Sequence, residues 1–308
     1  MDMEGTLCND LPSQPCLRNM LRHGIETLVA GGIQSARIDA EVLLADAVTM
    51  TREQIVVGAE LPISSEQLCR FDTLLQRRVQ REPVAYITER QEFWSLEFRV
   101  TPEVLIPRPE TERLIEIALS LAKDLPADKP QRFADIGTGS GIIAVSLARE
   151  LVTARVLATD ISTGALTIAR ENARLNGVAD RITFLAGNMF AALATGAEEF
   201  DLIVSNPPYI RRDEIATLEP EINRWEPRWA LDGGADGMDF YRCIAAQAWQ
   251  FLSPHGAVMV EIGAAMGCQV LAIFNQAGFY RDVTVMPDYA GRERVVIARN
   301  AARRLSSK

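Results

Sequence analysis

The sequence is poor in histidine and has no paired cysteines. It contains two histidines, His23 and His255, and five cysteines that form no Cys-x-x-Cys pair. A Ser-His-Asp triad or a histidine-built metal site needs converging imidazoles, and scattered thiols are most often buried or inert. We therefore expect neither a histidine base nor a bound metal in this protein.

A long apolar run is also missing. No stretch approaches the roughly 20 apolar residues that cross a bilayer. The first ten residues, MDMEGTLCND, have neither the basic flank and apolar core of a secretory signal nor the arginine-rich character of a transit peptide. We expect a cytoplasmic protein with no membrane partner.

Basic residues are in deficit. The chain has 32 Lys and Arg against 41 Asp and Glu, a formal net charge of −9. Proteins that bind duplexes usually carry an excess of basic side chains, because neutralised phosphates supply much of their affinity. Nucleic acid is therefore not expected as the main partner, although a local basic patch is compatible with this charge.

The sequence does contain the material for two domains. It has 308 residues, about twice a typical domain of roughly 150, and 48% of them are hydrophobic. Apolar residues recur at helical spacing over 17–28 and 36–48, and capping boxes stand at 51–54 and 64–67. We predict a small helical bundle over residues 1–83.

The periodicity changes after this bundle. Over 84–109 the aromatic, alternating stretch QEFWSLEFRV and three prolines predict a hairpin or extended connector. From residue 110 to 308, strand patterns alternate with helical patterns. The predicted strands are 132–136, 155–159, 181–185, 201–205, 257–262, 283–286 and 294–299, and the helices between or before them include 111–123, 142–150, 163–176 and 240–251. Such alternation predicts an α/β fold with a mainly parallel, seven-stranded sheet covered by helices on both faces.

A glycine-rich turn, DIGTGSG, occupies residues 135–141 between a strand and an apolar helix. Glycines there let backbone N–H groups approach a ligand, although a tight turn without a ligand would show the same letters. The spacing differs from the G-x-G-x-x-G of NAD enzymes, and no Walker lysine follows. Asp160 ends the next strand, where a carboxylate can bind both hydroxyls of a ribose or cap the following helix.

The most specific feature is SNPPYI, residues 205–210, at the end of a strand. Two consecutive prolines stop the strand and fix the directions of its last carbonyls. The Asn206 side-chain oxygen and the Pro207 carbonyl are two acceptors for a planar NH₂ group, and Tyr209 supplies a flat ring for its face. An ordinary proline turn is the alternative. The coincidence with the glycine loop favours a site.

With both motifs present, the chain resembles the S-adenosylmethionine-dependent amino methyltransferases, and among them the PrmC/HemK family of release factor glutamine methyltransferases. Similar stretches are VQREPVAYIT, VLIPRPETERLIE, DIGTGSGIIAVSLA, ATDIS, VSNPPYI, EPRWALDGGADGMDFYR and PDYAGRERVV, which span most of residues 77–297. The pair IPRPETE and NPPYI is more specific than NPPY alone, which DNA adenine methyltransferases share. The resemblance implies a Rossmann-like methyltransferase sheet.

The resemblance also implies an activity and its residues. The implied reaction moves a methyl group from S-adenosylmethionine to the glutamine side-chain nitrogen of the Gly-Gly-Gln segment in class I peptide chain release factors. Residues 1–83 are then expected to recognise the release factor. The residues expected to bind and orient the glutamine are Asn206, Pro207, Pro208 and Tyr209. Those expected to bind the donor are Gly137, Thr138, Gly139, Ser140, Gly141, Asp160, Asn188, Met189 and Asn206, where Asn188 replaces the acidic residue usual in the family.

Two other functions remain open at this point. A nucleic-acid amino methyltransferase would share NPPY but would need a basic, aromatic-lined groove. A non-catalytic donor-binding scaffold would fit an altered NPPY, and here the motif is intact. Arg108 could lie over the donor or form a structural ion pair, and Glu226 is expected to be a solvated or loop-ordering charge.

Overall fold

The chain divides into two units, Met1–Glu89 and Arg90–Lys308, in a computed structural model that describes residues 16–125, 130–193 and 199–301. The expectation of a cytoplasmic protein used the first ten residues, which lie outside the described ranges. Within the described ranges, no helix is long and apolar enough to cross a membrane.

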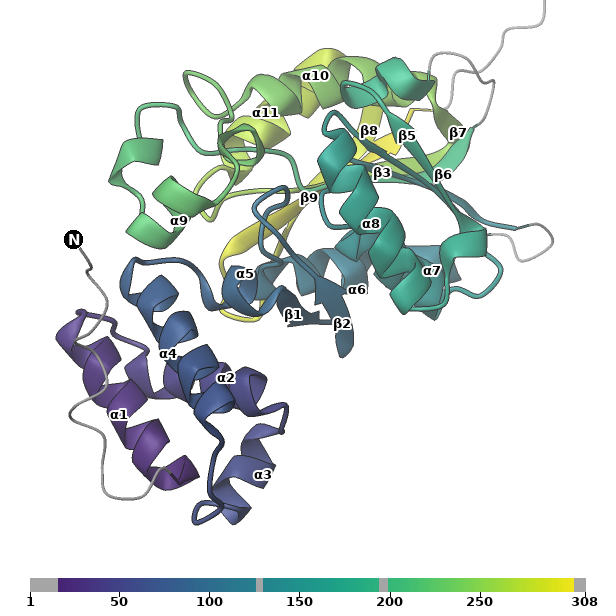
Figure 1. Ribbon diagram of the computed structural model, residues 1–308. Helices are drawn as coiled ribbons and strands as arrows, with labels where there is room; N and C mark the ends of the chain where they lie inside the picture. The colour runs from purple at the N-terminus through teal and green to yellow at the C-terminus, as the bar shows by residue number, and fades with distance from the viewer. Residues whose placement is uncertain (1–15, 126–129, 194–198, 302–308) are drawn as a thin grey trace, which may run out of the picture. The chain divides into compact units, whose positions relative to one another are not determined.

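The first unit is helical, as predicted. Its helices are α1 (Leu17–Ala30), α2 (Ala36–Val48), α3 (Arg52–Val57), α4 (Ser65–Val79) and α5 (Val84–Thr88) (Figure 1). Both capping boxes are present: the Gln54 N–H donates to the Thr51 hydroxyl over 3.2 Å, and the Gln67 N–H donates to the Ser64 hydroxyl over the same distance. Apolar side chains of α1, α2 and α4 meet in one core, so hydrophobic packing holds the bundle together.

The segment 84–109 differs from the predicted connector. Residues Val84–Thr88 form α5, which packs into the core of the first unit through Ile87. The expected hairpin follows as β1 (Arg90–Phe93) and β2 (Leu96–Arg99), an antiparallel pair. Phe93 and Phe98 belong to a core cluster of the second unit. The segment is therefore not a separate connector: its helix belongs to the core of the first unit and its hairpin to a core of the second.

The second unit is built on the predicted seven-stranded sheet. Its strands are β3 (Arg132–Ile136), β4 (Arg155–Asp160), β5 (Ile182–Ala186), β6 (Phe200–Ser205), β7 (Leu252–Glu261), β8 (Tyr280–Pro287) and β9 (Glu293–Asn300). They lie in the order β5-β4-β3-β6-β7-β9-β8; β9 runs antiparallel to both β7 and β8, and the other neighbouring pairs are parallel. The chain leaves β3 toward β4 and later returns to β6 on the other side of β3. This makes a topological switch point, the usual ligand position in such sheets.

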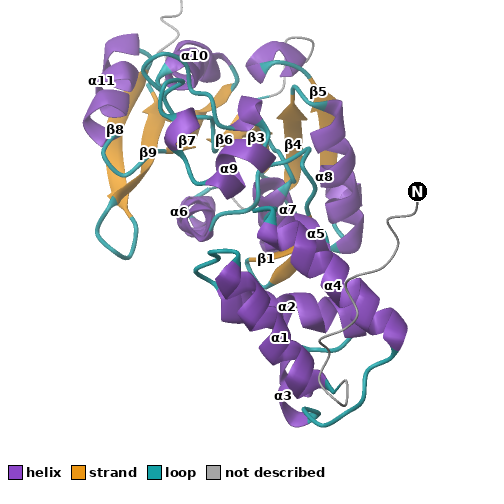
Figure 2. Cartoon of the chain, turned by 60° about the vertical axis from the view of Figure 1, so that its left-hand side comes forward, coloured by secondary structure: helices purple, strands orange, loops and turns teal. Residues whose placement is uncertain are grey.

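Helices cover both faces of this sheet (Figure 2). One core cluster includes side chains of α6 (Glu112–Lys123), α7 (Ile142–Glu150) and α8 (Thr163–Leu175), and the other includes α10 (Asp239–Gln247) and α11 (Gly267–Ala277). All six residues of β6 are buried, as expected of a central strand covered on both sides. The remaining short helices are η1 (Pro109–Thr111), η2 (Ala179–Arg181), η3 (Met189–Leu193), η4 (Ile215–Thr217), α9 (Pro220–Trp225), η5 (Arg228–Ala230) and η6 (Ala248–Gln250).

Candidate functional site

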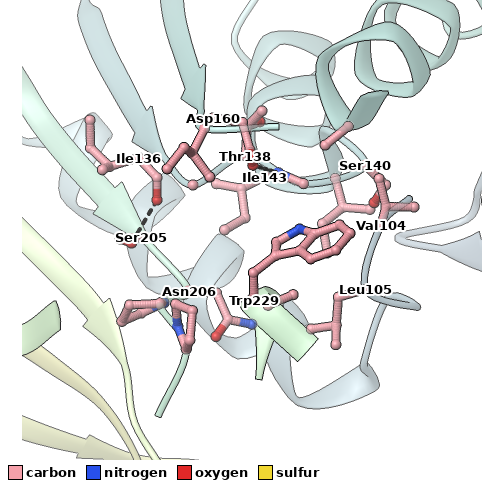
Figure 3. Close-up of a pocket in the computed structure, with 18 of the residues that line it drawn as sticks. Val104, Leu105, Ile136, Thr138, Ser140, Ile143, Asp160, Ser205, Asn206 and Trp229 are labelled. Carbon is pink, nitrogen blue, oxygen red and sulfur yellow. Dashed lines mark hydrogen bonds between the residues drawn. The ribbon is translucent and has the colours of Figure 1, made fainter. Parts of the chain in front are cut away.

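A cavity lies at the carboxyl ends of the central parallel strands in the second unit (Figure 3). Parallel strands end at the same edge of a sheet, so loops far apart in sequence meet there. The cavity is lined by residues of 103–108, by Gly137–Ser140 after β3, by Asp160 at the end of β4, by Gly187–Met189 after β5, by Ser205–Pro208 after β6, and by Trp229 and Ala230 of η5. The sequence predicted four of these segments.

The glycine loop lines the cavity and leaves space at Gly137 and Gly139. The N–H groups of Gly137 and Thr138 both donate to the carbonyl of Thr159, over 2.9 and 2.8 Å, which turns the loop tightly over β4. Gly139 has φ +55°, and a Cβ added there would meet no atom within 4 Å. Because this left-handed conformation costs other residues energy, glycine both permits the turn and leaves space for a ligand.

Asp135 fixes this loop from behind and was not singled out in the sequence. Its Oδ2 accepts the Thr138 hydroxyl over 2.6 Å and the Ala144 N–H over 3.1 Å. Burial raises the pKa of Asp135 to about 7. The Asp-x-x-Thr spacing within DIGT was the available signal, but it becomes informative only when the strand is known to be buried.

Asp160 connects the glycine loop to α8. Its Oδ2 accepts the Gly139 N–H and its Oδ1 accepts the Ser162 N–H, each over 2.9 Å. The N-cap of α8 is Ser162, whose hydroxyl accepts from Ala165 over 3.1 Å, so the alternative that Asp160 caps this helix was wrong. Burial raises the pKa of Asp160, and its carboxylate lines the cavity.

The NPPY turn faces the glycine loop across the cavity. The Ser205 hydroxyl donates to the Ile136 carbonyl over 2.6 Å, which ties the end of β6 to the end of β3 (Figure 3). Asn206, Pro207 and Pro208 line the cavity. The Asn206 Nδ2 donates to the Thr111 hydroxyl over 3.2 Å. An amide whose nitrogen is bound in this way presents its oxygen at its other end.

Tyr209 and Gly141, both predicted site residues, do not occur among the described residues that line the cavity. Gly141 begins α7, and Tyr209 packs against the second core cluster. Burial raises the pKa of Tyr209 to about 12, so its hydroxyl is protonated at neutral pH. A Cβ at Gly233 would lie 2.7 Å from the Tyr209 Cα, so the DGGADG loop fits against NPPY only with glycine at that position.

Asn188 and Met189 both line the cavity, at the start of η3. Their contact with an adenine stays a prediction. Trp229 also lines the cavity and is 53% exposed, so its indole is half open to solvent. The sequence analysis did not single out Trp229, although a tryptophan within EPRWAL, one of the stretches similar to the family, was an available signal.

Arg108 and Glu226 form an ion pair between two of the loops that line the cavity. The Glu226 carboxylate also accepts the Ile106 N–H over 3.3 Å. Burial raises the pKa of Glu226 despite the opposing charge of Arg108. Glu226 is 6% exposed, so the prediction of a solvated charge was wrong, and the loop-ordering alternative agrees with its contacts. The structural ion pair anticipated for Arg108 is present.

The arrangement places polar acceptors on two sides of the cavity. The glycine loop and the Asp160 carboxylate form one side, and the Asn206 amide forms the other. A carboxylate can accept from hydroxyl groups, and an amide oxygen can accept from an amino group. Within the described ranges, no group of three or more His, Cys, Asp or Glu side chains is placed to hold a metal ion.

Comparisons with known proteins show which family the chain is similar to. Two family models match: the PrmC N-terminal domain over residues 19–88 and the Methyltransferase small domain over residues 117–219. The release factor glutamine methyltransferase of Moorella thermoacetica is 44% identical over 282 residues, which cover 92% of this chain and 98% of that protein. The protein of the same name from Cereibacter sphaeroides is 44% identical over 279 residues, covering 91% of this chain and 96% of that one.

Among solved structures, the hMettl16 catalytic domain in complex with the MAT2A 3′UTR hairpin 6 matches with a TM-score of 0.54. The two chains are 17% identical, and the match covers 71% of this chain and 80% of that one. At this identity the likeness shows the methyltransferase fold alone.

Proposed function

This chain belongs to the release factor glutamine methyltransferase family, and from that premise we propose that it methylates the glutamine of the Gly-Gly-Gln segment in class I peptide chain release factors. The methyl group goes to the side-chain amide nitrogen. The observation that carries the proposal is the Asn206 amide, which lines the same cavity as the glycine loop and Asp160. We also propose that the protein acts in the cytoplasm.

The cavity residues fit S-adenosylmethionine. The glycine loop leaves open space where a Cβ at Gly137 or Gly139 would meet no atom within 4 Å. Asp160 supplies a carboxylate for ribose hydroxyls, and Asn188 and Met189 are proposed to lie beside the adenine. When bound, the sulfonium supplies an already activated methyl group.

Asn206 and Pro207 are proposed to orient the substrate amide. An amide nitrogen is a poor nucleophile because its lone pair is delocalised into its own carbonyl. Accepting both N–H groups, at the Asn206 Oδ1 and the Pro207 carbonyl, turns the nitrogen toward the donor and stabilises the positive charge that develops on it. We further propose that Pro208 holds this turn rigid and that Tyr209, whose ring packs against the second core cluster in this structure, takes part in orienting the amide. The extra proton leaves to water, so no histidine base is needed.

The donor site is tested by Asp160→Ala. We expect donor affinity to fall about ten- to a hundredfold, since a hydrogen bond to a charged group contributes about 1.5–3 kcal/mol. Calorimetric titration with S-adenosylmethionine measures this. Asp160→Asn is the companion variant: it keeps the shape of aspartate but has no charge and one acceptor oxygen, so it can keep only one of the two N–H bonds that Asp160 accepts. Unchanged affinity in Asp160→Ala would place the ribose contact elsewhere.

The substrate class is tested by transfer from a radiolabelled donor. We expect label on full-length class I release factor and none on duplex DNA, single-stranded DNA or RNA. A release factor whose Gly-Gly-Gln glutamine is replaced by alanine is the control for the acceptor. Label on nucleic acid alone would support the rival amino methyltransferase function.

A further inference from the structure

Thr111 and Glu261 lie behind Asn206 of the NPPY turn. The Asn206 Nδ2 donates to the Thr111 Oγ1 over 3.2 Å, and the Glu261 carboxyl group is near enough to the Thr111 hydroxyl for this hydroxyl to lower the Glu261 pKa. Thr111 ends η1, and Glu261 ends β7, which is paired with β6 up to Ser205. Thr111 and Glu261 are each 1% exposed. The series of contacts from Asn206 through Thr111 to Glu261 therefore runs from the cavity into the interior.

The chemistry of these three side chains determines which group donates and which accepts. A hydroxyl has one hydrogen, and an ionised carboxylate can only accept, so Glu261 takes the hydrogen of Thr111. What Thr111 then offers to Asn206 is a lone pair. Only the NH₂ end of the Asn206 amide can bind a lone pair, so its oxygen faces the cavity. By shape alone the two ends of an amide are nearly equivalent.

We infer that Thr111 and Glu261 are positioning residues, which act through Asn206 by fixing which end of its amide meets the substrate. The inference rests on the proposed function, in which the Asn206 oxygen accepts from the glutamine NH₂. A flipped Asn206 would present its own NH₂ to the substrate NH₂, and two donors cannot bind each other. The Thr111–Glu261 pair excludes that state.

The surroundings of Glu261 bring its ionisation near neutral pH. Its Oε2 has no hydrogen-bond partner within the described parts of the chain, and neither has the Nε of Arg294, whose charge acts on Glu261. Burial raises the pKa of Glu261 to about 7, against the opposing charge of Arg294. The charged and titratable groups that interact with it are Arg294, Arg108, Glu110, Tyr209 and Tyr241.

Protonation of Glu261 removes the directing effect. A neutral carboxylic acid can donate to Thr111, whose hydrogen then turns toward Asn206 and selects the amide oxygen. The active orientation belongs to ionised Glu261, so kcat should rise with pH and level off above about pH 7. For one group with this pKa, kcat at about pH 6 should be roughly a tenth of its plateau.

The first test compares Thr111→Val with Thr111→Ser. Valine keeps the shape of threonine and removes the hydroxyl, whereas serine keeps the hydroxyl. We expect kcat on release factor to fall about tenfold or more in Thr111→Val and to stay within about threefold of wild type in Thr111→Ser. Donor affinity should match wild type in both. Equal kcat in the two variants, with wild type active, would overturn the inference.

The second test uses Glu261→Gln, which cannot ionise and, like the protonated acid, can donate to Thr111 through its NH₂. We expect kcat to stay low at about pH 8.5 and the fall in kcat at low pH (the acidic limb) to be lost, because no ionised carboxylate fixes the Thr111 hydrogen at any pH. This comparison decides whether Glu261 causes the fall in kcat at low pH. The pKa of Asp135 is also raised to about 7, and any effect of Asp135 on kcat would persist in Glu261→Gln. An acidic limb unchanged in Glu261→Gln would contradict the inference.

A spectroscopic arm needs no substrate. With ¹⁵N-labelled asparagine, the side-chain resonances of Asn206 are those lost in Asn206→Ala. They should shift with pH in wild type, with a midpoint near 7, and should stay constant in Glu261→Gln. Asn206 resonances that do not change with pH in either wild type or Glu261→Gln would overturn the inference. If wild type methylates no release factor, the proposed function fails, whereas this arm still decides whether Thr111 and Glu261 control the amide.

Discussion

Asn206→Ala is expected to lower kcat for release factor methylation at least about a hundredfold, the scale seen when one preorganised transition-state partner is removed. The Asn206 amide lines the cavity and is held by Thr111, so its oxygen stands ready before substrate binds. The charge that it stabilises grows only during transfer. Donor affinity should change only several-fold, because the glycine loop and Asp160 remain.

Single-turnover kinetics and donor titration separate these two effects. Asn206→Asp is the informative companion variant, since it keeps the shape and the acceptors but adds a negative charge. If orientation of the substrate amide dominates, the aspartate variant should retain more activity than the alanine variant. If a neutral group is needed to place the amide, both should be inactive. Near-normal methylation by folded Asn206→Ala would remove NPPY from the mechanism.

Removing the first unit should have the second large effect. We expect a fragment of residues 90–308 to bind S-adenosylmethionine with near-normal affinity and to lose at least about a hundredfold in kcat/KM for release factor. A loss of this size corresponds to about 2.7 kcal/mol of binding. The described cavity residues all belong to the second unit, and so do two separate core clusters. We therefore propose that the helical unit recognises the protein substrate.

Circular dichroism and donor titration establish whether the fragment is folded, and steady-state kinetics with intact release factor give kcat/KM. The isolated unit of residues 1–89, added in excess to full-length enzyme, is the complementary experiment. It should inhibit methylation if it binds release factor. Equal kcat/KM for the folded fragment and the full-length enzyme would contradict a recognition role for the helical unit.

Most of the fold could be predicted from local sequence patterns. The capping boxes at Thr51 and Ser64 are local hydrogen bonds between residues three apart, so the letters alone predict them. The buried strand β6 is equally legible, because a short apolar run ending at two prolines has few other interpretations. Helix α5 was missed since it is five residues long and its β-branched residues resemble a strand, while tertiary packing decides its conformation.

The site was predictable only in part, for a physical reason. The glycine loop, Asp160 and Asn206 follow parallel strands, whose carboxyl ends must meet, so their convergence could be expected. Thr111 lies 95 residues before Asn206, and Arg108 lies 118 residues before Glu226. Neither pair obeys a periodicity. Such contacts depend on how loops fold over the sheet, which one sequence does not reveal.

The central claim is that the glutamine of the Gly-Gly-Gln segment receives the methyl group. Mass spectrometry of class I release factor, after incubation with the wild-type enzyme and S-adenosylmethionine, tests it most directly. Fragmentation of the peptide that contains this segment should locate the added mass of one CH₂ group on the glutamine side chain. The same peptide should stay unmodified with Asn206→Ala. A Gly-Gly-Gln peptide left unmodified by wild-type enzyme in every class I release factor tried would contradict the account.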